Sequence, residues 1–351
     1  MQIGICLMPD VDELTFFPFV ENLGYDSVWV ADSQMLFSDC YATLALAAGM
    51  TRRIRLGTGT SVCGTRIAPV QVSSIATINR LAPGRVFLSV ATGNTAMRAM
   101  GHPPMRIREY RAYLEVLAPL LRGEVAEYQG RAARILLHDE NGHMSLEPRI
   151  PLYVSGYGPR AMELAGEFGD GLVFTTAPRG ASVPEAMARV RAGADRAGRS
   201  LDGFWTCALV SIAMLEPGEE PNSERVIEQI GANAINAAYY YYDLIQERGG
   251  DPPDFLKPIW KRYCELIEEV PAEHRHFRTH EYHYTRLHPA EAELITADLV
   301  RNTCLVGTAD ELLDQIRALE AQGLGELMWG TGGPGKWPFA EAFSRQVLRR
   351  L

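Results

Sequence analysis

The sequence predicts an α/β protein whose core is a closed (β/α)8 TIM barrel, with a mainly helical insertion after the seventh strand. From the first residues onward, short apolar runs alternate with segments of helical spacing, and eight such runs occur along the chain. Most of these runs are apolar on both faces, which is typical of parallel strands covered by helices. The eightfold repeat favours a closed barrel over an open sheet, and it predicts an active site at the carboxyl ends of the strands.

The expected strands are short apolar runs that end in small or polar residues. They cover residues 3–8, 25–32, 54–56, 85–93, 151–156, 170–176, 204–215 and 325–330. The helical segments between them cover residues 12–23, 40–50, 68–84, 106–122, 159–169, 183–199 and 308–322. The helix at 68–84 carries end signals, since Pro69 lies in its first turn and Gly84 follows its last apolar residue.

Residues 216–300 do not follow the repeat. The stretch EPGEEPNSE reads as a loop, whereas GANAINAAYYYYDLIQERGG and FLKPIWKRYCELIEEVP have helical patterns. We interpret 216–300 as an insertion that lies over the barrel mouth as a lid, within a single barrel domain of residues 1–351. A separate small domain is the alternative, but the pattern indicates no core of its own. The tyrosine run 239–242 is interpreted as helix packing.

Composition excludes several classes of protein. The formal net charge is −9 and the basic residues are scattered, which argues against a nucleic-acid surface. No run of 18 apolar residues occurs, so no membrane span is expected, and the N-terminus shows no signal core, which predicts a cytoplasmic protein. The six cysteines form no C-x-x-C pair, so neither a disulfide framework nor a zinc site is expected.

The stretch LGTGTSVCGTR at 56–66 is unusual for the end of a buried strand. Five small residues, 57–61, follow one another and leave the backbone nearly bare. A close-packed turn explains such a run, and so does a flat ligand that touches the main chain. The residues around the stretch favour the ligand.

The residues just past each strand are small or carry hydroxyl groups, as in a rim that binds a cofactor. Four segments resemble the luciferase-like family of flavin-dependent oxidoreductases: GYDSVWVADS, IRLGTGTSVCGTRIAPVQVSSIATINRLAPGRVFLSVATGN, PLYVSGYGPRAMELAGEFGDGLVF and VGTADELLDQIRALEAQGLGELMW. The resemblance covers roughly residues 1–215 and 301–345. It implies a barrel that binds a flavin or deazaflavin at its carboxyl rim.

The resemblance also implies which residues contact the cofactor. Ser61 and Val62 match a bulge with a non-proline cis peptide behind the flavin ring, and a cis bond is therefore expected between them. Thr92, Gly93 and Asn94 match the residues at the polar edge of the ring; for Asn94, a helix N-cap is the alternative. The stretch SGYGPR opens a helix, whose N-terminus suits a phosphate; the residues expected there are Ser155, Gly156, Tyr157, Gly158 and Arg160.

The resemblance does not assign a catalytic residue, because the chain departs from the family at one position. The candidates are Asp32, Ser33, His276 and His280. Many relatives carry a histidine where this chain has Ser33, next to Asp32, and serine is no base near neutral pH without a partner. Asp32 is expected to be mainly structural. Four histidines occur at 274–283; His276 and His280 share a face if the segment is helical, and one of them is a candidate for acting on substrate. We expect no metal site there, because no recognisable ligand motif is complete.

Three functions are consistent with these patterns. The leading interpretation is a monooxygenase that uses reduced FMN and molecular oxygen on a small organic substrate, with a separate flavin reductase as a partner. The alternative is a reductase or dehydrogenase that depends on the deazaflavin coenzyme F420 and transfers hydride to or from a substrate carbon. The third is a flavin-binding protein without catalysis. The protein is expected to form a homodimer or higher homo-oligomer.

Overall fold

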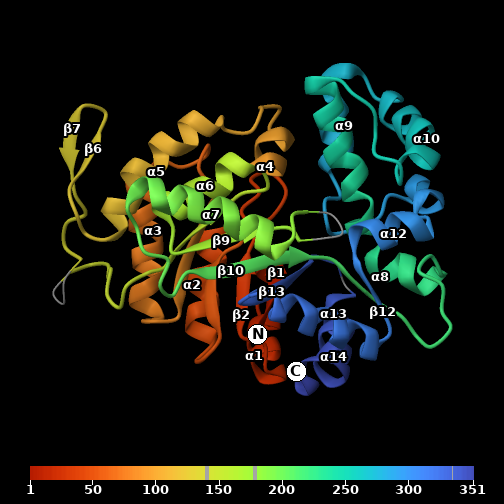
Figure 1. The fold of residues 1–351 in the computed structure, drawn as a ribbon, viewed down its shortest axis with the longest axis horizontal. Helices are drawn as coiled ribbons and strands as arrows, with labels where there is room; N and C mark the ends of the chain where they lie inside the picture. The colour runs from red at the N-terminus through yellow and green to blue at the C-terminus, as the bar shows by residue number, and fades with distance from the viewer. Residues whose placement is uncertain (139–141, 177–179, 334) are drawn as a thin grey trace.

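The computed structural model is a closed barrel of parallel strands surrounded by helices (Figure 1). It describes residues 1–138, 142–176, 180–333 and 335–351. Around the barrel, in the order in which they pair, lie β3 (Arg55–Thr58), β2 (Ser27–Val30), β1 (Gln2–Leu7), β13 (Glu326–Thr331), β10 (Trp205–Val210), β9 (Gly171–Phe174), β8 (Leu152–Ser155) and β5 (Val86–Ala91). Pairing of β3 with β5 closes the ring, so the predicted fold class is confirmed.

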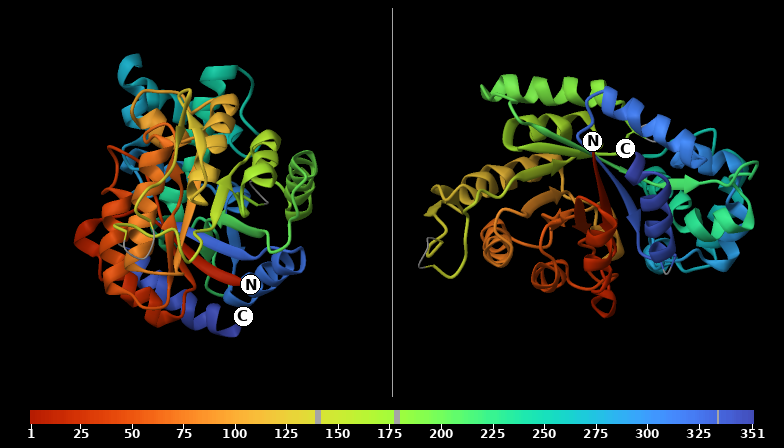
Figure 2. Two further views of the ribbon diagram at one scale, coloured as in Figure 1. Left: turned by 90° about the vertical axis from the view of Figure 1, so that its left-hand side faces the viewer. Right: turned by 90° about the horizontal axis from the view of Figure 1, so that it is seen from below.

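Helices cover the outside of the barrel and both termini lie near the amino ends of the strands (Figure 2). The covering helices are α1 (Phe16–Leu23), α2 (Cys40–Met50), α3 (Ala68–Leu81), α4 (Asn94–Ala99), α5 (Ile107–Leu121), α6 (Pro159–Phe168), α7 (Val183–Ala197), α13 (Ala309–Ala321) and α14 (Lys336–Gln346). Short 3-10 turns occur at η1 (Val11–Glu13) and η4 (Leu348–Arg350). The sequence pattern did not indicate α4, α14 or the hairpin of β6 (Ala126–Tyr128) and β7 (Arg131–Ala133).

Aromatic rings fill the barrel interior. The ring centroids of Trp29 and Phe87 are 4.2 Å apart, and Tyr153 stacks on Trp29 at 5.6 Å. A buried carboxylate, Glu326, accepts hydrogen bonds from Trp29 Nε1 at 2.8 Å and from Trp205 Nε1 at 3.0 Å. Since Glu326 begins β13, this layer closes the amino end of the barrel and leaves the carboxyl end for a site.

The predicted seventh strand at 204–215 is two strands that belong to different sheets. β10 stays in the barrel, whereas β11 (Ile212–Met214) pairs in parallel with β12 (Leu305–Gly307) outside it. The insertion therefore leaves and re-enters the barrel through one small sheet. Between β11 and β12 lie α8 (Glu224–Ala234), α9 (Asn236–Arg248), α10 (Lys257–Glu268), η2 (Ala272–His274), α11 (Arg275–His280), η3 (Pro289–Leu294) and α12 (Ala297–Thr303).

The insertion buries an apolar cluster that the sequence pattern did not indicate. Tyr239, Tyr242 and Tyr263 are buried in this cluster, which is separate from that of the barrel. The interpretation of the tyrosine run as helix packing is confirmed for Tyr239 and Tyr242. The buried carboxylate of Glu291 accepts a hydrogen bond from Tyr239 Oη at 2.7 Å and pairs with Arg278 at 2.9 Å, which ties η3 to α9 and α11.

Among the described residues, no helix has both the length and the apolar character that crossing a bilayer requires. The expected homo-oligomer stays a prediction.

Gly57 is required by packing inside the barrel. A Cβ atom there would lie 2.2 Å from the ring of Phe87 and 2.5 Å from the Phe87 carbonyl oxygen. We expect Gly57→Ala to lower the free energy of unfolding by about 1–3 kcal/mol, as overpacking typically does. Gly49→Ala is the control, because that exposed position in α2 has open space and alanine should stabilise the helix by roughly 0.5–1 kcal/mol. Denaturant unfolding measures both; equal stability of the two variants would contradict the packing argument.

Candidate functional site

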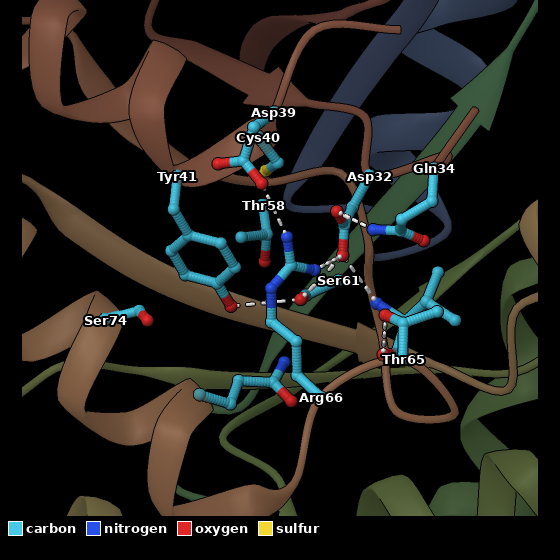
Figure 3. A network of polar contacts seen from close by, with 12 residues as sticks. Asp32, Gln34, Asp39, Cys40, Tyr41, Thr58, Ser61, Thr65, Arg66 and Ser74 are labelled. Carbon is cyan, nitrogen blue, oxygen red and sulfur yellow. Dashed lines mark hydrogen bonds and ion pairs between the residues drawn. The ribbon is translucent and has the colours of Figure 1, made fainter. Parts of the chain in front are cut away.

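The rim at the carboxyl end of the barrel is organised by the carboxylate of Asp32, which follows β2 (Figure 3). Oδ2 of Asp32 accepts hydrogen bonds from Ser61 Oγ at 3.0 Å and from the Val62 backbone N–H at 3.0 Å. Arg66 Nη1 lies 2.6 Å from the same oxygen, and Gln34 Nε2 donates to Oδ1 at 2.5 Å. With all of these donors on one buried carboxylate, Asp32 has a structural role, as the sequence suggested.

A tyrosine completes this network from the neighbouring helix. The hydroxyl of Tyr41 lies 3.0 Å from Ser61 Oγ, and Ser61 in turn donates to Asp32. Burial holds the pKa of Tyr41 well above its usual range, so the hydroxyl stays protonated and donates to Ser61. The Arg66 guanidinium covers the Tyr41 ring at 4.8 Å and reaches Asp39 at 2.8 Å.

The non-proline cis peptide of the bulge joins Gly59 to Thr60. The sequence-based position, Ser61–Val62, was therefore wrong by two residues. Ser61 and Val62 form the short strand β4 (Ser61–Val62), which pairs in register with Val90 and Ala91 of β5, and that pairing uses extended backbone. Both residues of β4 are buried, whereas Gly59 and Thr60 are half-buried. The backbone that the rim presents is thus that of Gly59 and Thr60.

Packing also explains why residue 59 is glycine. A Cβ atom there would lie 2.7 Å from Trp29 Cβ and 2.8 Å from the Trp29 carbonyl carbon. The run of small residues at 57–61 therefore has two causes: close packing against Phe87 and Trp29, and a half-buried backbone turn at the rim.

The turn after β5 lies beside this bulge. Gly93 has a positive φ of 83° and is the N-cap of α4, and a Cβ atom on it would lie 2.4 Å from Val62 Cγ1. Asn94 is the first residue of α4 rather than its N-cap, and its Oδ1 accepts a hydrogen bond from Arg98 Nε at 3.1 Å. Thr92 is half-buried, and its carbonyl accepts from the Met105 N–H. The structure brings these residues to the rim, and contact with a cofactor stays a prediction.

The residues expected to bind a phosphate surround the start of α6. Gly158 is the N-cap, has no side chain to cap the helix, and has nothing within 4 Å of the position of a Cβ atom. Gly156 is packed against Ala161, where a Cβ atom would lie at 2.7 Å. Ser155 is half-buried, whereas Tyr157 and Arg160 are exposed. The N-terminus of α6 is therefore open, and its first-turn N–H groups suit an anion.

The histidine segment lies on the side of the insertion that faces α4. His276 and His280 are both in α11, so the expected shared helix is confirmed. His280 is 2% exposed and its Nε2 lies 3.2 Å from Asp243 Oδ2. His276 packs against Phe277 with ring centroids 4.0 Å apart. Ser33 is half-buried after β2. Within the described residues, no three His, Cys, Asp or Glu side chains gather as a metal site.

Residues 283–285 form a strap across the barrel mouth, which the sequence analysis missed. His283 Nε2 lies 3.2 Å from Thr95 Oγ1, near the end of β5. Tyr284 packs over Gly330 of β13, where a Cβ atom would lie 3.1 Å from its ring, and Thr285 reaches Gly332. Because β5 and β13 are four strands apart in the ring of eight, the strap spans the mouth from one side to the other. The backbone turns at Tyr284, which has a positive φ of 58°. Tyrosine is not a residue type that predicts such a turn, so the sequence did not indicate it.

A cavity of about 230 Å³ lies where the insertion meets the rim. Its walls are Met35 and Leu36 after β2, Ala99 of α4, and His276, Phe277, His280 and Glu281 of the insertion. Since β3 lies between β2 and β5 in the barrel, this cavity is over the sector that contains the Gly59–Thr60 bulge. Both histidines that the sequence singled out therefore border a cavity at the predicted end of the barrel.

The chain matches the model of the luciferase-like monooxygenase family over residues 12–326. Because the match covers most of the chain, the protein belongs to this family, and the resemblance found in the sequence is confirmed. The family assignment places the chain among oxidoreductases.

Individual relatives agree with this assignment. The chain is 25% identical to the 5,10-methylenetetrahydromethanopterin reductase of Archaeoglobus fulgidus, with 100% of each chain covered. It is 33% identical over 180 residues to the F420-dependent glucose-6-phosphate dehydrogenase of Beutenbergia cavernae, which covers 47% of this chain and 52% of that one. Among solved structures, the coenzyme F420-dependent tetrahydromethanopterin reductase of Methanopyrus kandleri has a TM-score of 0.71 and 22% identity, with 99% of each chain covered.

The Asp32 network predicts a large difference between two substitutions. Asp32→Asn removes the buried partner of Arg66 and should lower the free energy of unfolding by about 3 kcal/mol, because it leaves the largely buried guanidinium with only the exposed Asp39 and removes the charge that accepts from Ser61 and Val62. Asp39 is the other partner of Arg66, and its side chain is 55% exposed. Asp39→Asn removes this charge but keeps a side chain that can cap α2. The loss of unfolding free energy should therefore stay below about 1 kcal/mol. Urea unfolding compares the two. A loss in Asp32→Asn no larger than that in Asp39→Asn would remove Asp32 as the organiser of the rim.

Proposed function

We propose that the protein is a deazaflavin-dependent oxidoreductase that transfers hydride to or from a carbon atom of a small organic substrate. The observation that carries this proposal is the combination of a half-buried backbone turn at Gly59–Thr60 with the open N-terminus of α6 on the same rim. A flat ring against the turn and a phosphate at the helix would engage both features.

The similarities to known proteins favour one of the two cofactors named from the sequence. The full-length relative from Archaeoglobus fulgidus is a reductase of a pterin substrate, and two of the similar proteins carry F420 dependence in their names. These similarities support coenzyme F420 over reduced FMN, so the sequence-based alternative becomes the leading hypothesis. The monooxygenase with FMN is supported by the family description and by monooxygenases among the similar solved structures, which are 16–17% identical, and it becomes an outcome of the cofactor test.

The residues at the rim fit a bound ring and phosphate. A Cβ atom at Gly158 would meet open space, so the approach to the first turn of α6 is unobstructed. Gly59, Thr60 and the turn at Thr92–Asn94 would hold the ring, and Gly156, Gly158 and Arg160 would hold the phosphate. Bound deazaflavin supplies two-electron hydride chemistry at a ring carbon and needs no oxygen.

The chain itself positions the ring and excludes water. Asp32 fixes the bulge through Ser61 and Val62, so the turn keeps its shape without a ligand. The strap at 283–285 covers the mouth from β5 to β13 and places the ring of Tyr284 over Gly330. We propose that the insertion acts as a lid that shields the transferred hydride from solvent.

Titration of the purified protein with oxidised and reduced F420 and with oxidised and reduced FMN tests this proposal. We expect F420 to bind at least tenfold more tightly than FMN in the same redox state, a difference of about 1.4 kcal/mol. Tighter binding of reduced FMN, together with consumption of oxygen, would instead support the monooxygenase. Binding of either cofactor without turnover of any substrate in a broad screen would favour the non-catalytic interpretation.

A pair of substitutions at Gly158 tests the phosphate position. Asp and Asn are both good N-caps of nearly equal size, and the open space at Gly158 accommodates either. We expect Gly158→Asp to weaken F420 binding at least tenfold more than Gly158→Asn, because only the carboxylate repels a phosphate at the helix N-terminus. Isothermal titration calorimetry measures both affinities. Equal affinities of the two variants would place the phosphate elsewhere.

A further inference from the structure

A histidine–carboxylate pair lies where the insertion meets the barrel rim. Nε2 of His280 is 3.2 Å from Oδ2 of Asp243, and the two side chains are 3% and 14% exposed. Arg98 of α4 approaches the same carboxylate oxygen at 3.5 Å and reaches Glu247 with its other end. The contact is at ion-pair distance without hydrogen-bond geometry, so the carboxylate attracts the protonated imidazole from the Nε2 side of the ring.

The pair borders the cavity over the bulge. His280 lines this cavity of about 230 Å³ together with the loop after β2 and with Ala99 of α4. The cavity is smaller than the roughly 300–1,000 Å³ of typical ligand pockets, which suits a small substrate next to a larger cofactor. Its walls are mainly apolar at Met35, Leu36 and Phe277, and the one carboxylate, Glu281, disfavours an anionic substrate.

Other ionisable groups at the strand ends are already engaged. Among the described residues that directly follow the barrel strands, the acidic side chains are Asp10 and Asp32. Asp10 is exposed and accepts from the Asp12 N–H as the cap of a 3-10 turn, and Asp32 is surrounded by donors. Ser33 stands where a histidine is found in many relatives. The titratable residues that line the cavity, His276, His280 and Glu281, all come from the insertion.

We propose that His280 is the catalytic acid–base residue of the site, that Asp243 is its positioning residue, and that the substrate is a small neutral or cationic compound with a carbonyl, imine or alcohol carbon. This inference rests on the proposed function. In the reducing direction, the substrate carbon receives hydride from C5 of the reduced deazaflavin, and the C=O or C=N electron pair moves to the heteroatom. His280 gives that atom its proton through Nδ1, since Nε2 faces Asp243. The substrate is reduced, the deazaflavin is oxidised, and His280 regains a proton from water.

Several charged or titratable groups lie around the His280–Asp243 pair. Asp243 and Glu247 come from α9 and Arg98 from α4, while the segment of His280 itself contributes His276, Glu281 and His283. Tyr263 of α10 interacts with Asp243. Burial raises the pKa of Tyr263 well above its usual range, with the Asp243 charge adding to the effect, so this hydroxyl stays neutral. Asp243 is the carboxylate that contacts the imidazole, and the test therefore varies it separately from Glu247.

The first experiment follows the imidazole by NMR and needs no substrate. The ring signal of His280, identified by the signal lost in His280→Asn, should change its chemical shift in Asp243→Asn, because that variant removes the carboxylate charge 3.2 Å from Nε2. Glu247→Gln is the matched control, since it removes the other acidic partner of Arg98 without touching His280, and it should leave the His280 signal unchanged. Oxidised F420 should then move the His280 signal and leave the exposed His274 signal in place.

The second experiment measures single-turnover reduction of cyclohexanone by the protein loaded with reduced F420. We expect His280→Asn to slow this step at least about a hundredfold, within the range of general acid catalysis, and to abolish its pH dependence, while His274→Asn stays within threefold. F420 affinity should remain within threefold in His280→Asn, which separates a lost proton donor from a lost cofactor site.

The outcomes separate the two proposals. If the parent protein does not bind F420, the proposed function fails, while the effect of Asp243→Asn on the His280 signal still reports on the pair. If F420 binds but leaves the His280 signal unmoved, or if His280→Asn keeps the parent rate and pH profile, the acid–base role is wrong although the cofactor assignment holds.

Discussion

The shape of the rim depends on the buried carboxylate of Asp32. Beyond β3 the chain leaves the barrel ladder, turns through Gly59–Thr60, and rejoins it as β4. Such a turn leaves backbone N–H groups without strand partners, and Asp32 accepts one of them from Val62. The same carboxylate accepts a hydrogen bond from Ser61 and balances the charge of Arg66. One side chain therefore pairs with the hydrogen-bond donors of the turn and with its nearest positive charge. A rigid turn of this kind presents backbone to a flat ligand without reorganisation on binding.

The insertion is the second determinant of the site. It enters and leaves through the β11–β12 pair and buries its own apolar cluster, so it stands as a folded unit next to the barrel. Its contacts with the rim include apolar packing of Tyr284 over Gly330 and several polar pairs, namely Arg98 with Asp243 and Glu247, and His283 with Thr95. Polar contacts of this type resemble a transient interface more than a core, and they are consistent with an insertion that opens to admit substrate and closes over it.

The barrel and the insertion divide the proposed function between them. The strand ends supply backbone and glycine for the cofactor, and the described residues there offer no unengaged acid–base group. The insertion supplies imidazole and carboxylate groups near the same sector of the rim. Where many relatives place a histidine after the second strand, this chain has Ser33, and the proposed acid–base group comes from the insertion. Substrate choice and proton transfer would then both depend on the insertion.

Much of this architecture is determined by the sequence alone. The alternation of apolar runs with helical spacing identified the eight strands, because strands buried on both faces have to be apolar throughout. The small residues at 57–61 and the SGYGPR stretch identified two parts of the rim, since glycine and a helix start have local signatures. The break between β10 and β11 was not predicted, because a single apolar run continues through it and only pairing with β12 separates the two strands.

The remaining features were decided by tertiary structure. The cis bond lies at Gly59–Thr60 rather than at Ser61–Val62, because pairing of β4 with β5 fixes the latter residues as extended strand. The sequence singled out the histidine tract that includes His283, but it did not indicate the strap, because the contacts of His283 with Thr95 and of Tyr284 with Gly330 join residues far apart in the chain. The sequence named His280, but its partner Asp243 lies 37 positions earlier on another helix. Local patterns thus determine elements and turns, whereas the pairing of distant side chains follows only from the packing of the insertion against the barrel.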